Sequence, residues 1–183
     1  MKAPENPPEV AVSSTRVYDG RVVRLRVDEI RSAGGRRGTR EVVEHPGAVA
    51  IVPLLPGPRV VLLRQWRYCV GGWLLEIPAG TLEPGEEPLE CARRELIEET
   101  GHAAARVQPV LSFYTTPGFS TEILRIFLAT ELTPKEARQD EDELLETVAV
   151  EWDEAVAMCL DGRIRDAKTI AGMLAVDRIL ASA

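Results

Sequence analysis

Apolar and polar residues alternate along the first part of the chain, in the period-two pattern of strands with one buried face. The turn residues Asp19-Gly20 and the segment GGRRG divide this part into three runs, of which TREVVEH is the last. We therefore predict a small antiparallel sheet over residues 15–45. Residues 1–14 are rich in Pro, Glu and Ser, which predicts a loose terminus. The apolar positions of the sheet are Val17, Val22, Leu25, Val27 and Ile30.

The middle of the chain contains apolar, β-branched runs typical of buried strands. GAVAIVPLL and RVVLLRQWRY are two such runs separated by PGP, and WLLEIPAG is a shorter strand that ends in a Pro/Gly loop. RVQPVLSFYTTPG, STEILRIFLATEL and LLETVAVEW also have the character of strands, and KEARQDEDE predicts an acidic loop before the last of them.

Three segments predict helices. Glu87-Pro88 begins a helix, because proline is tolerated in the first turn, and Gly101 is a natural residue to end it after Thr100. DEAVAMCLDG and DAKTIAGMLAVDRILAS are amphipathic. Strands and helices are mixed without regular alternation, so we predict an α/β sandwich with a mixed sheet rather than a doubly wound parallel sheet.

Composition narrows the class of protein. With 183 residues, 45% hydrophobic and 28% charged, the chain suits one globular domain with a small appendage. No apolar run approaches the roughly 18 residues of a membrane helix, and MKAPENPPEV lacks the apolar region of a secretory signal. The three cysteines are scattered and no zinc-binding spacing exists, so we expect a reducing, cytoplasmic compartment. Because there is no membrane helix, we expect no association with membranes.

Charge is distributed unevenly along the chain. Residues 1–75 hold 12 basic and 7 acidic residues, whereas residues 76–183 hold 10 and 22, within a net charge of −7. An acidic protein of this kind is not expected to bind nucleic acid. A basic part beside an acidic part suits an anionic small ligand bridged by metal cations; the alternative is that the asymmetry has no function.

Seven glutamates lie between Gly80 and His102, and three of them share one helical stripe. Glu95, Glu98 and Glu99 fall within about 100° on the helical wheel. Like charges at this spacing cost a few tenths of a kcal/mol per pair. The stripe therefore predicts a site for hard divalent cations such as Mg²⁺, with a solvated face as the alternative.

The rest of the wheel predicts how this helix packs. Leu89, Ala92 and Leu96 occupy the flank next to the stripe and are expected to face the core. Arg93 and Arg94 are the nearby basic residues, and on the wheel they point away from the stripe.

The frame around the stripe resembles the Nudix box, GX5EX7REUXEEXGU, in which U is an aliphatic residue. Gly80 is followed after five residues by Glu86, and after seven more by RELIEETG, residues 94–101. Eight of the nine specified positions match, and His102 stands where the pattern has an aliphatic residue. The resemblance implies an enzyme that hydrolyses nucleoside diphosphates linked to another moiety.

The resemblance also implies roles for the residues of the box. Glu95, Glu99 and the Ala79 carbonyl match metal ligands, and Glu98 a supporting carboxylate that acts in catalysis. Two or three Mg²⁺ ions would bind there, with Mn²⁺ as an alternative. Four further positions match structural residues: Glu86 and Arg94 as a pair that braces the loop, Gly80 at a tight turn, and Gly101.

Segments outside the box resemble the ADP-ribose pyrophosphatase branch of the family. They are VVEHPGAVAIVPL, WLLEIPAG, YTTPGFSTE, with Pro117 16 residues after Gly101, and DGRIRDAKTIAGML. The resemblance implies cleavage of ADP-ribose to AMP and ribose 5-phosphate. The alternatives are another nucleotide sugar, such as GDP-mannose or a second ADP-sugar, or a non-catalytic ADP-ribose sensor. Residues 46–183 would then form the Nudix domain, and residues 1–45 a dimerisation region of a homodimer.

Further residues are candidates for catalysis and substrate binding. In this branch an acidic loop supplies the base, so Glu143 is our first candidate and Glu141 the second; the alternative is a solvated loop. Arg64 and Arg67 are candidates for the phosphates, or for ordinary ion pairs.

The last candidates lie outside the box and the acidic loop, and for Arg40 and Pro117-Gly118 they follow from the resemblance. Glu76 is expected to touch the site, and Arg40 to reach the site of a partner subunit. Pro117-Gly118 is predicted to contact substrate, or to form only a turn. Trp66 or Tyr18 would stack on adenine or else fill the core.

Overall fold

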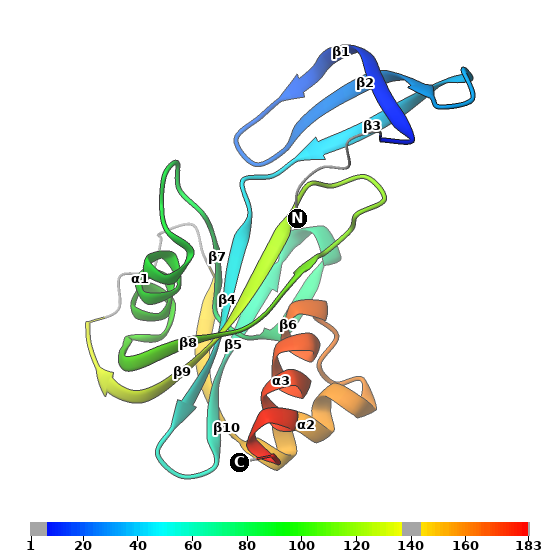
Figure 1. Cartoon of the computed structure of the whole chain (residues 1–183). Helices are drawn as coiled ribbons and strands as arrows, with labels where there is room; N and C mark the ends of the chain where they lie inside the picture. Colours follow the sequence, from blue (N-terminus) through cyan, green and yellow to red (C-terminus); the bar gives the residue numbers. More distant parts are fainter. Residues whose placement is uncertain (1–6, 137–143, 183) are drawn as a thin grey trace. The chain divides into compact units, whose positions relative to one another are not determined.

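The structure is a computed structural model that describes residues 7–136 and 144–182. By their internal contacts these residues form two compact units, drawn in Figure 1. Of the described residues, one unit contains 7–47 together with 114–123, and the other contains 48–113, 124–136 and 144–182. A short segment far along the sequence therefore groups with the N-terminal part of the chain.

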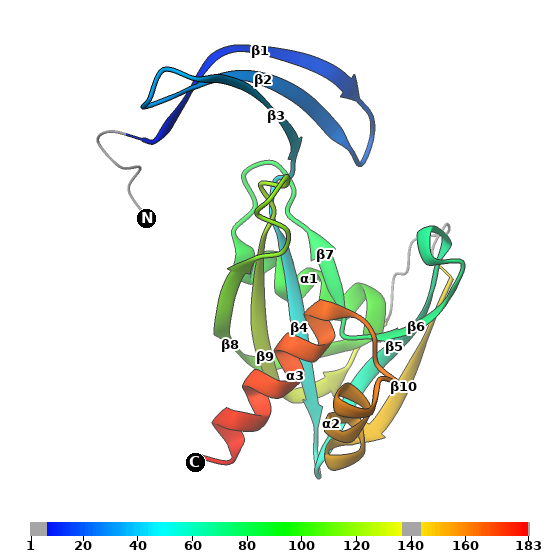
Figure 2. The same ribbon diagram turned by 90° about the vertical axis from the view of Figure 1, so that its right-hand side faces the viewer.

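The first unit is built on a three-stranded antiparallel sheet, which confirms the predicted N-terminal sheet (Figure 2). Its strands are β1 (Glu9–Asp19), β2 (Arg24–Ser32) and β3 (Arg37–Glu44). The expectation of a loose terminus was wrong for residues 9–14, because they pair with β2 in the register Glu9↔Ser32 to Ser14↔Asp28. Composition alone does not reveal a neighbouring strand that satisfies the backbone.

Residues 114–123 are bound to the end of β3 through the backbone. The Val43 N–H donates to the Phe119 carbonyl at 2.7 Å, and the Thr121 N–H donates to the Val43 carbonyl at 3.0 Å. His45 extends this contact, since its N–H donates to Thr121 Oγ1 at 2.9 Å.

The second unit contains a mixed sheet of seven strands. Strands β10-β5-β4-β9-β8 are neighbours in that order, while β6 pairs with β5 and β7 with β4. Strand β4 is parallel to β9, and its pairings with β5 and β7 are antiparallel. The bounds are β4 (Ala48–Leu55), β5 (Arg59–Arg67), β6 (Gly72–Glu76), β7 (Ala79–Thr81), β8 (His102–Tyr114), β9 (Ile123–Pro134) and β10 (Leu145–Glu151), with a 3₁₀ turn at Tyr68–Val70.

Helices cover both faces of this sheet, as the predicted α/β sandwich requires (Figure 1). Helix α1 (Pro88–Thr100) packs on β4 and β9, and α2 (Trp152–Asp161) and α3 (Ala167–Leu180) pack on the opposite face. Ala92 and Leu96 are buried as predicted, but Leu89 is 37% exposed. The prediction for Leu89 was wrong, because the wheel gives the direction of a side chain but not how far the neighbouring elements cover the first turn of the helix.

Strand β7 takes the place of part of the Pro/Gly loop predicted at the end of WLLEIPAG. It pairs with β4 through Ala48↔Thr81, Val49↔Gly80 and Ala50↔Ala79. Three residues are too few for a periodic pattern, so the strand is defined by its neighbour and not by its own sequence. Among the described residues, no helix is long and apolar enough to cross a membrane.

Candidate active site

The site is built where β7 meets α1. The helix begins at Pro88 and ends at Thr100, as predicted, and Gly101 follows it in the left-handed conformation with φ 66°. The Gly101 N–H donates to the Ile97 carbonyl at 2.9 Å, which satisfies a carbonyl of the last turn. The C-terminal end of the helix is therefore fixed by local chemistry, and Pro88 marks its first turn.

Gly80 permits the close approach of helix and strand. A Cβ atom at this position would lie 1.7 Å from Glu95 Oε1 and 1.9 Å from Glu95 Cδ. The residue lies inside β7, and its φ is not positive, so the expectation of a tight turn here was wrong. Glycine is needed because the Glu95 carboxylate lies directly against the strand backbone.

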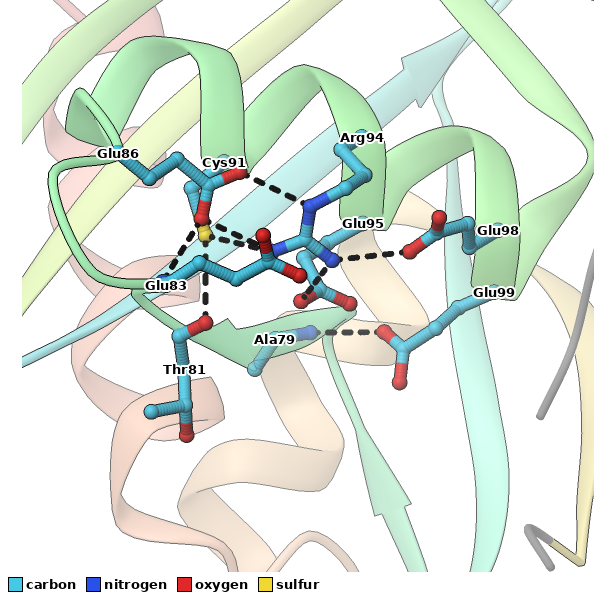
Figure 3. A network of polar contacts seen from close by, with 9 residues as sticks. All are labelled: Ala79, Thr81, Glu83, Glu86, Cys91, Arg94, Glu95, Glu98 and Glu99. Carbon is cyan, nitrogen blue, oxygen red and sulfur yellow. Dashed lines mark hydrogen bonds and ion pairs between the residues drawn. The ribbon is translucent and has the colours of Figure 1, made fainter.

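Arg94 connects the loop before the helix with two glutamates of the stripe (Figure 3). Its Nε and Nη2 donate to the two Glu86 carboxylate oxygens at 2.9 and 3.0 Å. Its Nη1 donates to Glu95 Oε1 at 2.8 Å and to Glu98 Oε2 at 2.9 Å. The expectation that Arg94 points away from the stripe was wrong, because the wheel gives the direction of Cβ but not the reach of a long side chain.

Hydrogen bonds hold Glu86 in its ionised form. The bonds from Arg94, together with one from the Glu83 N–H at 3.0 Å, lower the pKa of Glu86 to about 2. Glu86 also lies near Cys91, whose Sγ accepts from Arg94 Nη2 at 3.3 Å. Burial raises the pKa of Cys91 to about 12, so the thiol stays protonated.

The Glu86–Arg94 pair should stabilise the protein in a pH-dependent way. The folded-state pKa of Glu86 is below its unfolded value of about 4.3, so the unfolded state binds more protons as pH falls. The difference in unfolding free energy between wild type and Glu86→Gln should be constant above about pH 5 and shrink as pH falls toward 2. Urea unfolding from pH 7 to pH 3 measures it, and a gap independent of pH would contradict the assignment.

Glu99 is the most deeply buried carboxylate of the stripe. It is 5% exposed, and its Oε2 accepts from the Ala79 N–H at 2.9 Å. Figure 3 shows Glu95 and Glu99 both directed at β7. The predicted metal ligands Glu95, Glu99 and Ala79 thus lie together at the junction of β7 and α1, with Glu98 beside them.

The donor set at this junction suits a hard divalent cation. Carboxylate oxygens are the ligands that Mg²⁺ prefers, and the Arg94 Nη1 bonds show that a positive charge is accommodated between Glu95 and Glu98. Within residues 7–136 and 144–182, no three acidic, histidine or cysteine side chains are already grouped as a metal site. Ligation would therefore involve a change in the contacts between these glutamates and Arg94.

A second polar cluster joins β5, β6 and α3. Arg67 Nε and Nη2 donate to the two oxygens of Glu76 at 2.8 and 2.7 Å, and Lys168 Nζ also bonds Glu76 Oε2. Burial alone would raise the pKa of Glu76, which is 1% exposed, but its bonds to Arg67 and Lys168 hold that pKa below the ordinary value. The structure brings the predicted residues Arg67 and Glu76 together.

Lys168 is a member of this cluster that sequence reasoning missed. It lies in the DGRIRDAKTIAGML segment, which was assigned only to a helix and to the branch. The predicted helix DAKTIAGMLAVDRILAS begins at Asp166, which is the observed N-cap, so the sequence already places Lys168 in the first turn. Its contact with Glu76, 92 residues away, has no local signal.

Arg64 belongs to a different environment from Arg67. Its Nη1 donates to Glu146 at 3.3 Å, and its guanidinium carbon lies 4.3 Å from the centre of the Trp73 ring. Trp66 packs edge-to-face on Trp73, with ring centres 5.7 Å apart. Trp66 and Tyr18 are both exposed, so neither fills the core. Their stacking on a base stays a prediction.

The remaining candidates lie in the first unit or outside the described residues. Arg40 Nε donates to Glu9 at 3.1 Å, within the N-terminal sheet. Pro117 and Gly118 lie in a turn in which the Ser120 N–H donates to the Thr116 carbonyl at 2.9 Å. Glu141 and Glu143 fall outside the described residues. Their roles at the substrate stay predictions.

Comparison with known proteins agrees with this geometry. A family model described as the NUDIX domain matches residues 44–173, and the chain belongs to the Nudix family. This membership establishes the class as a Nudix hydrolase, a family that generally uses divalent metal. The match includes β7, the whole of α1 and the first half of α3.

The chain is similar to several described members of the family. The chain is 39% identical to a methanol dehydrogenase activator of Bacillus methanolicus, over 88% of this chain and 89% of the other. It is 38% identical to an ADP-ribose pyrophosphatase of Bacillus subtilis (strain 168), over 88% of both chains. A GDP-mannose pyrophosphatase of Yersinia enterocolitica is 40% identical over 72% of this chain and 73% of the other.

A solved structure shares the fold. A crystal structure described as an ADP compounds hydrolase superposes with a TM-score of 0.86 and covers 98% of each chain. The identity is 22%, so this match supports the architecture alone.

Proposed function

We propose that this Nudix hydrolase cleaves the pyrophosphate bond of ADP-ribose. Water adds to one phosphorus, the bridging P–O bond breaks, and AMP and ribose 5-phosphate form. The observation that carries the proposal is the packing of Glu95 and Glu99 against β7, with Glu98 beside them and Arg94 within hydrogen-bonding distance. The similarity to an ADP-ribose pyrophosphatase supports the choice of substrate.

The glutamates of α1 would hold the metal. Glu95, Glu99 and the Ala79 carbonyl are the proposed ligands of two or three Mg²⁺ ions, or of Mn²⁺, with Glu98 as a supporting carboxylate. Bound divalent cations neutralise a diphosphate and lower the pKa of a coordinated water. Glu86 would keep Arg94 in place while the glutamates exchange its contacts for the metal.

Arg67 is the proposed phosphate ligand, because its side chain is 39% exposed while Glu76 fixes the plane of its guanidinium. Glu143, or else Glu141, would accept the proton of the attacking water. We further propose a homodimer that uses residues 1–45, in which Arg40 serves the partner's site. The exposure of every residue of β1 in the single chain supports this pairing. Pro117, Gly118 and Arg64 complete the proposed substrate contacts.

A second candidate substrate is GDP-mannose or another ADP-sugar, supported by the similarity to a GDP-mannose pyrophosphatase. The box glutamates and their support are the same for either substrate, because they act on the diphosphate. A non-catalytic sensor is disfavoured, since Glu95, Glu98 and Glu99 are all retained.

Product release from a substrate panel tests the proposal. The panel contains ADP-ribose, GDP-mannose, ADP-glucose, NADH and 8-oxo-dGTP, each assayed with Mg²⁺ and with EDTA. We expect ADP-ribose to have the highest kcat/KM, to yield AMP, and to be inert in EDTA. A higher kcat/KM for another compound would replace the substrate but keep the chemistry, whereas binding of ADP-ribose without turnover would indicate the sensor.

A further inference from the structure

The first turn of α3 is fixed against the strand that carries Glu76. Asp166 caps the helix, accepting from the Thr169 N–H at 3.0 Å. Thr169 Oγ1 in turn accepts from the Ile77 N–H, next to Glu76, at 2.9 Å. Lys168 lies between Asp166 and Thr169, so the Thr169–Ile77 hydrogen bond places its backbone next to the residue that follows β6.

Lys168 lies between two carboxylates. Its Nζ bonds Glu76 Oε2 and lies 3.1 Å from Asp166 Oδ2. The Lys168 side chain is 16% exposed, so water screens these charges less than at an open surface. Without the ammonium group, two largely buried carboxylates would lose the cation that lies between them, and Asp166 also acts on the Arg67 charge.

Glu76 bonds both Arg67 and Lys168, and its bonds to Arg67 determine the orientation of the guanidinium group. Nε and Nη2 of Arg67 are bound to Glu76, which leaves Nη1 as the remaining nitrogen of the guanidinium. A bidentate pair fixes the guanidinium plane and so gives Nη1 a fixed direction. This geometry needs Glu76 to be the single carboxylate that orients Arg67, which Lys168 secures by compensating Asp166.

Arg67 is linked to the proposed metal ligands through the charge of Glu99. The Glu99 charge raises the pKa of Arg67, after the larger effect of the Glu76 hydrogen bonds. A phosphate held by metal at Glu99 would therefore be within the electrostatic reach of Arg67.

We infer that Lys168 is a positioning residue: it compensates Glu76 and Asp166 so that Arg67 presents its guanidinium to the diphosphate of the substrate. The inference rests on the proposed role of Arg67 in phosphate binding. Lys168 itself is assigned no contact with substrate. It acts through Glu76 and Arg67, and its effect should disappear when Arg67 is removed.

A double-mutant cycle tests this dependence. Lys168→Met, Arg67→Met and the double variant are compared by kcat/KM on the panel compound that wild type cleaves fastest, and by the Kd of ADP-ribose in EDTA. We expect Lys168→Met to lower kcat/KM about tenfold, chiefly by raising KM, and to raise the Kd of ADP-ribose about tenfold. In the Arg67→Met background, Lys168→Met should have no further effect on either quantity. Lys168→Arg should recover most of the loss.

Two controls separate positioning from folding. Lys135→Met removes the same charge from an exposed site of the second unit and should behave as wild type. Lys168→Gln keeps a hydrogen-bond donor, and the same cycle is run with it if Lys168→Met does not fold. The cycle measured with Lys168→Gln should show the same coupling to Arg67.

Three outcomes would overturn the inference. Additive losses in the double variant would mean that Lys168 acts independently of Arg67. A lower Tm with unchanged KM and Kd would mean a purely structural role. A wild type that neither binds nor cleaves any panel compound would overturn both this inference and the proposed function. A wild type that binds ADP-ribose without turnover would refute only the hydrolysis, and the binding cycle would still decide the role of Lys168.

Discussion

Replacement of Gly80 by alanine should remove most of the hydrolase activity and leave the protein folded. The new Cβ would overlap the Glu95 carboxylate, with Oε1 at 1.7 Å, Cδ at 1.9 Å and Cγ at 2.5 Å. The backbone at Gly80 is not in the left-handed region, so alanine is tolerated there and the side chain of Glu95 must move. A displacement of a reacting group by about 1 Å costs on the order of 10²-fold in rate.

Gly72→Ala is the matched control for this variant. Gly72 also lies in a short strand of the second unit, but a Cβ there would meet no atom within 4 Å. We expect kcat within about twofold of wild type for Gly72→Ala and a loss of about 10²-fold for Gly80→Ala, with similar Tm values for both. If Gly80→Ala retained full kcat, the position of Glu95 against β7 would have no bearing on catalysis.

Glu99→Gln should lower the hydrolase activity more than Gly80→Ala does. A glutamine oxygen can still accept from the Ala79 N–H, so the contact that holds β7 to α1 is kept. The negative charge proposed to bind metal is lost, and we expect kcat to fall by on the order of 10³-fold, with a higher Mg²⁺ concentration needed for half-maximal rate. Steady-state rates at a series of Mg²⁺ concentrations measure both effects.

Glu90→Gln controls for the loss of a charge from the same helix. Glu90 is exposed, and its nearest charged partner is Arg93 at 4.0 Å, so the substitution should leave kcat and the Mg²⁺ dependence unchanged. Wild-type kcat in Glu99→Gln would refute the assignment of Glu99 as a metal ligand. An equal loss in both variants would instead indicate a general effect of the charge of α1.

The two variants together separate position from charge. Gly80→Ala keeps all the glutamates but displaces the Glu95 side chain. Glu99→Gln keeps the side chain at residue 99 in position and removes its charge. Loss of activity in both, with the fold preserved, is the result that a metal site between β7 and α1 requires.

The sequence by itself determined the elements whose signals are local. The apolar runs of β4 and β5 identify buried strands wherever they are placed. Pro88 and Gly101 mark the ends of α1, because each restricts or relaxes its own backbone. The spacing of the glutamates on α1 is likewise a property of one helix, and it sufficed to place Glu95, Glu98 and Glu99 on one stripe. The family was identified from the frame of Gly80, Glu86 and residues 94–101 around that stripe.

Only the tertiary structure decided what depends on contact between distant segments. Strand β7 exists because β4 pairs with it, and Gly80 must be glycine because Glu95 packs onto that strand. Arg94 turns toward the stripe because two carboxylates lie within its reach, which a helical wheel does not represent. Lys168 meets Glu76 across 92 residues of sequence. Such contacts depend on the distance between side chains in the folded chain, and a linear pattern carries no measure of that distance.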